Sequence, residues 1–204
     1  MILDPKTLPP SAMYRFMIRA IVPRPIAFIS TLGEGGRFNV APFSFFCGLS
    51  GEPPLLGISI NARRGTLKDT LRHLRATGDF VVNVVGEPLL EKMVMASGEW
   101  AAEVDEFQLT GLTPVPSDLV RAPRVGECPV SFECRVHREM DLGTTTFVVG
   151  EIVRAHVAES VLTDGQVDIT KLRPIGRLGG DEYSIVRDVV HVARPKVPPA
   201  AGQA

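Results

Sequence analysis

Hydrophobic residues along this chain form short apolar runs and alternating stretches, separated by prolines and glycines. Apolar runs over residues 26–31 and 55–60 are bounded by turn residues, and a valine-rich stretch follows at 79–85. Residues 130–137 alternate between apolar and polar side chains, which predicts a strand with one buried and one exposed face. Residues 144–157 are also β-rich. The pattern predicts a mainly β protein.

Helical spacing is confined to a few segments. Apolar residues recur at helical spacing over 67–74, and Thr66 and Asp69 have the spacing of a capping box with Thr66 as the N-cap. Gly78 is a stop signal for this helix. A second helix is predicted over residues 88–96.

The remaining segments are shorter or irregular. Residues 14–20 are predicted as a short helical turn, and 97–128 as mostly loop. We expect the strand over 144–157 to bend at Gly150. Many short strands with two helices favour a closed β-barrel with helical additions over a doubly wound sheet. We expect one domain over residues 1–194 and a disordered Pro/Ala-rich tail over 195–204.

Composition narrows the class of protein. The 204 residues include 22 basic and 23 acidic side chains, a formal net charge of -1, which gives no support for nucleic-acid binding. The three cysteines form no CxxC pair, so a reducing cytoplasm fits better than a disulfide framework. We see no signal peptide, and no apolar run approaches the ~20 residues of a membrane span. We therefore expect a cytoplasmic protein without a membrane or nucleic-acid partner.

A cationic turn precedes the first predicted helix. Arg63, Arg64 and Lys68 supply positive charge, and Thr66 and Thr70 supply hydroxyl groups. A helix N-terminus with these residues suits a phosphate group. A solvated, capped surface helix explains the same residues on spacing alone, so both interpretations stay open.

The segment 39–46 is the second candidate site. Asn39 and Ser44 are hydrogen-bonding groups among small and aromatic residues, and Pro42 should end or bulge the strand. A bulge there would expose backbone N–H groups to a planar heterocycle. The alternative is a strand end packed by phenylalanines.

Several familiar motifs are missing from the sequence. The glycine-rich stretch 33–36 is not followed by a helix, so it is no Rossmann fingerprint, and there is no Walker sequence. Cys134 and His137 should point to opposite faces of a strand, which argues against a shared metal site. No histidine has a nucleophile beside it in the sequence, so we name no catalytic residue and no metal ligand.

An ordered set of motifs resembles the flavin reductase-like, FMN-binding split-barrel family. The motifs are Pro23-Arg24-Pro25-Ile26-Ala27, Asn39-x-Ala41-Pro42-Phe43-Ser44-Phe45-Phe46, Pro53-Pro54, Lys68-Asp69-Thr70, Phe80-Val81-Val82-Asn83 and Asp105-Glu106-Phe107. Later motifs resemble its longer, flavoredoxin-type branch: Phe132-Glu133-Cys134, Val149-Gly150-Glu151-Ile152-Val153 and Arg177-Leu178-Gly179-Gly180-x-x-Tyr183. One departure is His73-Leu74, where the family pattern has Asn-Ile.

The resemblance implies a six-stranded antiparallel split β-barrel of Greek-key type, a homodimer, and non-covalently bound FMN. It places Ser30 and Thr31 by the flavin or its phosphate tail. It places further residues beside the flavin ring and its ribityl chain: Asn39, Ala41, Pro42, Ser44, Phe45, Phe46, Ser59, Ile60, Asn61, Arg177 and Tyr183. It places others at the phosphate: Arg63, Thr66, Lys68 and Thr70. Asp69 is interpreted mainly as a helix cap.

The activity implied by the resemblance is NAD(P)H-dependent flavin reduction. Hydride passes from nicotinamide to flavin N5, and electrons continue to a monooxygenase partner, ferric iron or another acceptor. A non-catalytic FMN electron carrier or flavin-storage protein is the main alternative. An oxidase of the pyridoxamine-phosphate type is a third, which would need a second basic cluster. Fold alone does not choose among them.

Overall fold

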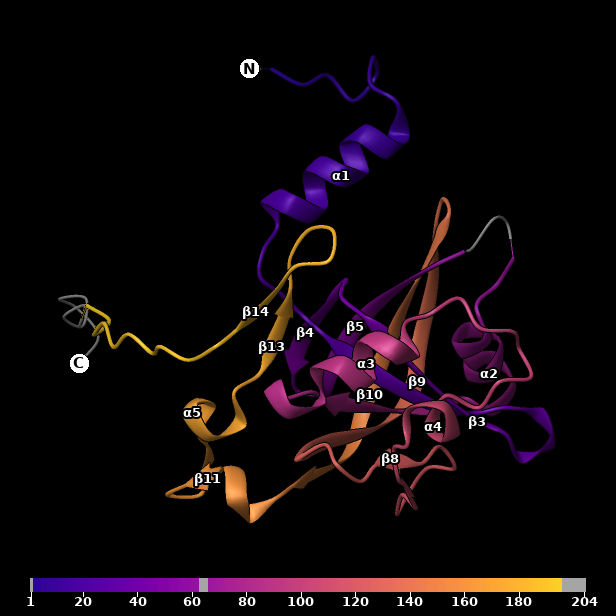
Figure 1. Cartoon of the computed structure of the whole chain (residues 1–204), viewed down its shortest axis with the longest axis vertical. Coiled ribbons are helices and arrows are strands. Elements are labelled where there is room, and N and C mark those ends of the chain that lie inside the picture. The colour runs from indigo at the N-terminus through magenta and orange to yellow at the C-terminus, as the bar shows by residue number, and fades with distance from the viewer. Residues whose placement is uncertain (1, 63–65, 196–204) are drawn as a thin grey trace, which may run out of the picture.

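A computed structural model describes residues 2–62 and 66–195 (Figure 1). The predicted disordered tail, apart from Pro195, lies outside the described residues. The helices are α1 (Pro10–Ala20), α2 (Asp69–Thr77), α3 (Leu90–Ala96), α4 (Glu106–Thr110) and α5 (Ile169–Leu172), with short 3₁₀ turns at Glu34–Gly36, Glu87–Leu89 and Glu159–Val161. Within these ranges, no helix is long and apolar enough to cross a membrane.

The strands dominate the molecule. They are β1 (Arg24–Pro25), β2 (Ala27–Leu32), β3 (Phe38–Phe43), β4 (Phe46–Gly51), β5 (Pro54–Asn61), β6 (Asp79–Val84), β7 (Pro114–Val115), β8 (Arg124–Val125), β9 (Val130–Leu142), β10 (Thr145–Val157), β11 (Leu162–Thr163), β12 (Gln166–Val167), β13 (Ile175–Arg177) and β14 (Tyr183–Ile185). The mainly β prediction is therefore confirmed.

One antiparallel sheet forms the barrel. Its strand order is β3-β2-β6-β9-β10-β5-β4, one strand more than the six expected. The edge strands β3 and β4 are joined by only Ser44 and Phe45, so both edges of the sheet meet at this short connection. Pro42 lies near the end of edge strand β3, where its missing N–H is tolerated, and the predicted end of the strand is confirmed.

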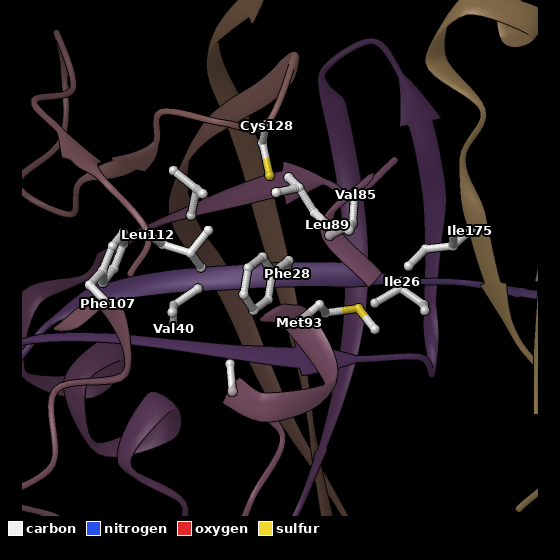
Figure 2. Close-up of a cluster of buried hydrophobic side chains, with 12 residues drawn as sticks. Ile26, Phe28, Val40, Val85, Leu89, Met93, Phe107, Leu112, Cys128 and Ile175 are labelled. Atoms are coloured by element: carbon white, nitrogen blue, oxygen red, sulfur yellow. The ribbon is translucent and has the colours of Figure 1, made fainter. Parts of the chain in front are cut away.

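Strand β2 is buried on both faces, which explains the continuous apolar run over 26–31. Phe28 faces a cluster that includes Met93 of α3 and Phe107 of α4, as Figure 2 shows. Ala27 and Ile29 face a second cluster inside the barrel, where residues of α2 also pack. Alternate side chains of a strand point to opposite faces, so β2 serves two cores.

The bend at Gly150 is confirmed by a register shift between Val149 and Gly150 in the β9–β10 pairing. A Cβ atom at Gly150 would lie 2.4 Å from Cζ of Phe80, so the absence of a side chain here also makes room for the Phe80 ring of β6. Helix α2 ends at Gly78, which has φ 73° in the left-handed region, as its sequence predicted.

The predicted capping box is wrong. Helix α2 begins at Asp69, and its N-cap is Lys68, which makes no side-chain capping hydrogen bond. Thr66 lies outside the helix, and the Asp69 side chain pairs with Arg72 one turn later. The local ion pair replaces the cap because Asp69 occupies the first helical position.

The half-exposed prediction for residues 130–137 is confirmed at Arg135 and His137, which are exposed, but it is wrong at Ser131 and Glu133, which are buried on the same face. The Ser131 hydroxyl donates to Asn83 Oδ1 over 2.9 Å. The Glu133 carboxylate accepts backbone N–H groups of residues 118 and 119 over 2.8 and 2.6 Å, and lies 2.6 Å from His156 Nε2. Hydrogen bonds from the loop 116–123 satisfy this buried charge, which a period of two cannot reveal.

Helix α1 and the β13–β14 hairpin lie outside the barrel sheet, on the same side of the molecule (Figure 1). Helix α1 has no buried residue, and it begins four residues before the predicted helical turn. The hairpin belongs to a small separate sheet with β1. These segments contribute to the site described next.

Candidate functional site

Two adjoining cavities open beside β3 and α2. The larger cavity has a volume of about 600 Å³ and the smaller cavity about 320 Å³. Pro42, Lys68 and Ser97 line both, so the two form one continuous groove. Volumes of this size suit a cofactor-sized ligand.

The start of helix α2 forms the cationic end of the larger cavity. The cavity wall includes Lys68, Asp69, Thr70 and Arg72. The N-cap residue Lys68 makes no side-chain capping hydrogen bond, so N–H groups of the first turn can serve a ligand. Together with the helix dipole and the two cations, these groups suit a phosphate.

Buried polar side chains connect β3 to α2 behind this wall. Asn39 Nδ2 donates to Thr31 Oγ1 and to Thr70 Oγ1, both over 3.3 Å. Thr31 Oγ1 also lies 3.0 Å from His73 Nδ1. Burial lowers the pKa of His73, so this network is held by a neutral imidazole near pH 7. The network fixes Asn39 relative to the start of the helix.

A buried carboxyl group lines the same cavity. Glu106 of α4 is 8% exposed, and its Oε2 accepts the backbone N–H of Val40 over a long 3.4 Å. Burial raises the pKa of Glu106 to about 7, and the nearby charges of Asp69 and Asp105 act in the same direction. The larger cavity therefore contains a group that gains or loses a proton near neutral pH.

The smaller cavity has aromatic walls from three separate segments. Phe45 lies in the β3–β4 connection, Tyr14 in α1, and Tyr183 in β14. The rings of Tyr14 and Phe45 meet edge to face with centroids 6.3 Å apart. The Arg177 guanidinium lies 4.5 Å above the ring of Tyr183. This arrangement suits a flat, polar ligand.

Arg24 connects these segments to one another. Its Nη1 donates to the carbonyls of Ile18 and Ile21 over 2.5 and 2.8 Å, and its Nη2 to that of Leu178 over 2.7 Å. Its Nε lies 3.4 Å from Ser44 Oγ, a weak contact. One buried guanidinium thus links the C-terminal end of α1, the β13–β14 hairpin and the short barrel connection.

The structure brings together most of the residues predicted from the sequence. Those that line the cavities are Asn39, Ala41, Pro42, Ser44, Phe45, Asn61, Thr66, Lys68, Thr70, Arg177 and Tyr183. Those that line neither cavity are Ser30, Thr31, Phe46, Ser59 and Ile60. Arg63 lies outside the described residues.

The residues away from the cavities have other partners. Ser30 Oγ donates to the Pro123 carbonyl over 2.5 Å and accepts from Asn83 Nδ2 over 3.0 Å, inside the protein. Ile60 is fully buried in the barrel core. Thr31 acts through its hydrogen bond to Asn39 and so supports the cavity wall from behind.

Sequence reasoning missed Glu106, Trp100 and Tyr14 as cavity residues. It also missed Arg24 as the residue that links α1 to the β13–β14 hairpin. Arg24 and Glu106 do lie in motifs that carry the family resemblance, which was the available signal. Trp100 lies in a stretch without regular period, where its indole N–H donates to the Met95 carbonyl over 2.9 Å.

Comparison with known proteins identifies the family. The sequence model described as "Flavin reductase like domain" matches residues 18–171. Nitrilotriacetate monooxygenase component B from Bacillus cereus has a similar structure, with a TM-score of 0.91 and 29% identity over 94% of this chain and 98% of that one. The Pseudomonas fluorescens 2-nitrobenzoate 2-nitroreductase gives a TM-score of 0.89 and 30% identity over 99% and 100%.

A flavoredoxin of Desulfovibrio vulgaris is also similar, with a TM-score of 0.74 and 28% identity over 89% of this chain and 93% of that one. Its presence among the structural relatives agrees with the motifs of the longer branch. The extra main-sheet strand leaves the split-barrel prediction intact. The chain therefore belongs to the flavin reductase-like family of split-barrel proteins.

Proposed function

We propose that this protein is an FMN-binding oxidoreductase that accepts hydride from NADH or NADPH. The observation that carries the proposal is the continuous groove, in which a cationic helix start adjoins a smaller aromatic cavity. A flavin mononucleotide has the matching form, a phosphate joined by a polar chain to a planar ring. The family and its flavin-dependent relatives support the same assignment.

The residues of the larger cavity would hold the phosphate end. Lys68 and Arg72 supply positive charge, and Thr66 and Thr70 supply hydroxyl groups near the start of α2. The β3 residues that line the groove would hold the ribityl chain and ring, with Ser44 at the far end. Nη1 of Arg177 is buried without a hydrogen-bond partner among the described residues, which supports a polar ligand in the smaller cavity.

When bound, the flavin would supply the redox chemistry, taking hydride from nicotinamide at N5 and passing electrons onward. The protein's residues would orient the ring and limit access of water. The Ser44 hydroxyl and backbone N–H groups near it can stabilise negative charge that develops on a bound ring.

The final electron acceptor is a monooxygenase partner, ferric iron or another small acceptor in this proposal. One structural relative is the B component of a monooxygenase, which supports the first of these. The cysteines at 47, 128 and 134 are free thiols, which fits the cytoplasmic location expected from the sequence.

We also propose that the protein is a homodimer. Helix α1 exposes Phe16 and Met17 at 52% and 39%, and edge strand β4 exposes Leu49 at 46%. Unpaired strand edges and exposed apolar side chains are typical of surfaces that another chain covers. Light scattering after size exclusion should give twice the monomer mass of 22.1 kDa.

A second candidate function is a carrier or store of FMN that reacts slowly with nicotinamides. The observation that favours it is the enclosure of the smaller cavity by Tyr14 from α1 and by Tyr183 from the C-terminal hairpin. These walls could exclude a nicotinamide from the flavin ring.

Visible absorption spectra of the purified protein separate the two functions. We expect flavin bands that bleach within the mixing time when anaerobic NADH or NADPH is added, with the faster donor identifying the physiological nicotinamide. Bands that persist with both donors would favour the carrier. Absence of bands after FMN addition and desalting, together with no turnover at excess FMN, would refute both.

A further inference from the structure

Two arginines lie side by side at the smaller cavity. Strands β1 and β13 pair antiparallel, and their register places Arg24 directly opposite Arg177. Like charges in directly opposite positions destabilise a sheet. Burial and the charge of Arg177 both lower the pKa of Arg24, so the neighbouring guanidinium adds to the cost of keeping Arg24 charged. The electrostatic cost of this pair must be offset by other interactions of the two guanidinium groups.

Arg24 is already occupied by protein groups. Its three nitrogens contact the carbonyls of residues 18, 21 and 178 and the hydroxyl of Ser44. These hydrogen bonds explain why Arg24 is buried. They do not explain why a second guanidinium, that of Arg177, lies opposite it. Arg24 serves as the connector of the cavity walls.

Arg177 differs from Arg24 because one of its nitrogens is buried without a hydrogen-bond partner among the described residues. Its guanidinium stacks 4.5 Å above the ring of Tyr183, and Nη1 is buried without a hydrogen-bond partner among the described residues. A buried donor without a partner costs free energy, and more so on a charged group. The unmet hydrogen bond points to a ligand that accepts it.

The charges of the smaller cavity favour an anion. Lys68 and Arg177 are the cations in its wall, and none of its lining residues in the described chain is an aspartate or glutamate. The larger cavity, by contrast, contains Asp69, Glu99 and Glu106 in its wall. Among the described residues, the wall of the smaller cavity therefore carries cations without carboxylates, although it lies away from the start of α2.

The walls also restrict the shape of the ligand. Tyr14, Phe45 and Tyr183 approach from three different segments. Such aromatic walls suit a planar group, with one edge near the guanidinium of Arg177.

We propose that Arg177 binds an oxyanion carried by the second, planar substrate of this flavoprotein, rather than part of the flavin itself. The inference rests on the proposed function, because it assumes that the flavin ring lies beside Ser44 and leaves the side of the smaller cavity lined by Arg177 and Tyr183 to the second substrate. The oxyanion has two possible sources: the carboxylate of an aromatic acid, or the 2′-phosphate that distinguishes NADPH from NADH. Both groups are anionic and accept hydrogen bonds from a guanidinium, so Arg177 would favour either over a neutral analogue.

The test uses the full-length, FMN-loaded protein and its Arg177→Gln variant. Benzoate and its neutral analogue benzamide are titrated while the visible spectrum of the bound flavin is recorded, and KM is measured for NADPH and NADH. Arg187→Gln is the matched control, because Arg187 is exposed and pairs with Glu87 outside the cavities. Arg177→Lys tests whether charge alone is sufficient.

If the carboxylate is the source, Arg177→Gln weakens benzoate binding by about 10- to 100-fold, the loss expected for a charge-assisted hydrogen bond. Benzamide binding and FMN affinity stay within about twofold of the original, and Arg187→Gln changes none of them. If the nucleotide phosphate is the source, KM rises for NADPH and not for NADH. Partial rescue by Arg177→Lys supports a charge role in either case.

Two results would overturn the inference. One is an Arg177→Gln variant in which both the benzoate-to-benzamide and the NADPH-to-NADH ratios are unchanged. The other is equal weakening of FMN and riboflavin, which would make Arg177 a ligand of the flavin ring. Failure of the proposed function gives a different result, because the original protein would then show no flavin bands or no bleaching by nicotinamide.

Discussion

The two cavities of this groove are built in different ways. The larger cavity is formed by barrel strand β3 and by helices that pack on it, and its polar wall is fixed by buried hydrogen bonds from Asn39. The smaller cavity depends on α1 and the β13–β14 hairpin, which lie outside the barrel sheet. Among the described residues, the larger cavity also mixes cations with carboxyl groups, whereas the charged groups in the wall of the smaller one are cations.

The difference indicates separate roles for the two ends of the groove. A wall that is part of the core keeps its geometry, which suits a resident cofactor. A wall made of added segments can differ in shape or charge while the core stays the same, which suits a variable substrate. Variants that affect only one cavity can test this division.

The largest effect is expected from Arg24→Gln. The change removes charge-assisted hydrogen bonds to three carbonyls that glutamine cannot reach together, and it should lower the free energy of unfolding by about 4 kcal/mol. Urea unfolding measures the loss. Arg187→Gln, which removes an exposed arginine, should cost less than about 1 kcal/mol.

The comparison of the two cavities also predicts that Arg24→Gln affects the smaller cavity more than the larger one. Variant protein that remains folded should bind FMN through the larger cavity, while the smaller cavity loses its alignment. A variant that keeps its stability and its smaller-cavity ligands would show that Arg24 does not connect the segments.

Glu106→Gln should stabilise the protein in a pH-dependent way. The pKa of Glu106 is raised from 4.5 to about 7, so its contribution is fully favourable below pH 4.5 and is lost as the pH rises through 7. Removing the ionisable group should add about 3 kcal/mol to the free energy of unfolding at pH 8 and almost nothing at pH 4. Unfolding curves of the flavin-free protein at both pH values measure this, and an equal gain at both would contradict it.

The same carboxyl group should affect flavin binding. Above pH 7 it adds a negative charge to the larger cavity beside Asp69, so the affinity for FMN should fall more steeply in the original protein than in Glu106→Gln. Riboflavin, which has no phosphate, is the control ligand. If FMN and riboflavin respond equally to pH, the phosphate does not lie near Glu106.

Lys68→Ala should weaken FMN binding by about tenfold, the effect of losing one charge-assisted contact to a phosphate. Riboflavin binding should change much less. Arg75→Ala is a matched control on the same helix, because Arg75 lies in the last turn and pairs with Glu139. Fluorescence titration of both flavins measures the ratio, and equal losses for both would remove Lys68 from the phosphate site.

The smallest effect is expected from Ser44→Ala. Loss of one neutral hydrogen bond should weaken flavin binding by about threefold or shift the flavin potential slightly. Ser50→Ala is the control, since Ser50 is exposed on β4 and bonds to the carbonyl of Glu52. Unchanged affinity and potential would show that Ser44 does not contact the flavin.

The barrel strands and the C-terminal ends of α2 and β3 were largely predictable, because each depends on local pattern. Residues 26–31 read as a buried strand since both faces of β2 are apolar, and Gly78 ends its helix through its own backbone. Asn39, Lys68 and Thr70 all line the larger cavity, and the ordered family motifs indicated all three.

Contacts between distant segments were not predictable from local pattern. Arg24 binds the carbonyl of Leu178, which lies 154 positions later. Glu106 lies in a five-residue helix inside a stretch without regular period, too short to give a helical signal. Its pKa depends on burial, which only the packing of α4 against β3 produces.

The placement of the smaller cavity's walls has consequences for how the protein can be altered and prepared. Because α1 and the β13–β14 hairpin are near the two ends of the chain, the substrate preference can be altered by exchanging terminal segments while the barrel sequence is kept. Arg24 marks where such an exchange must be compatible, since it holds both segments. Purification tags and truncations near residue 14 would act on the same surface, so we expect a chain shortened there to lose the ligand preference proposed for the smaller cavity.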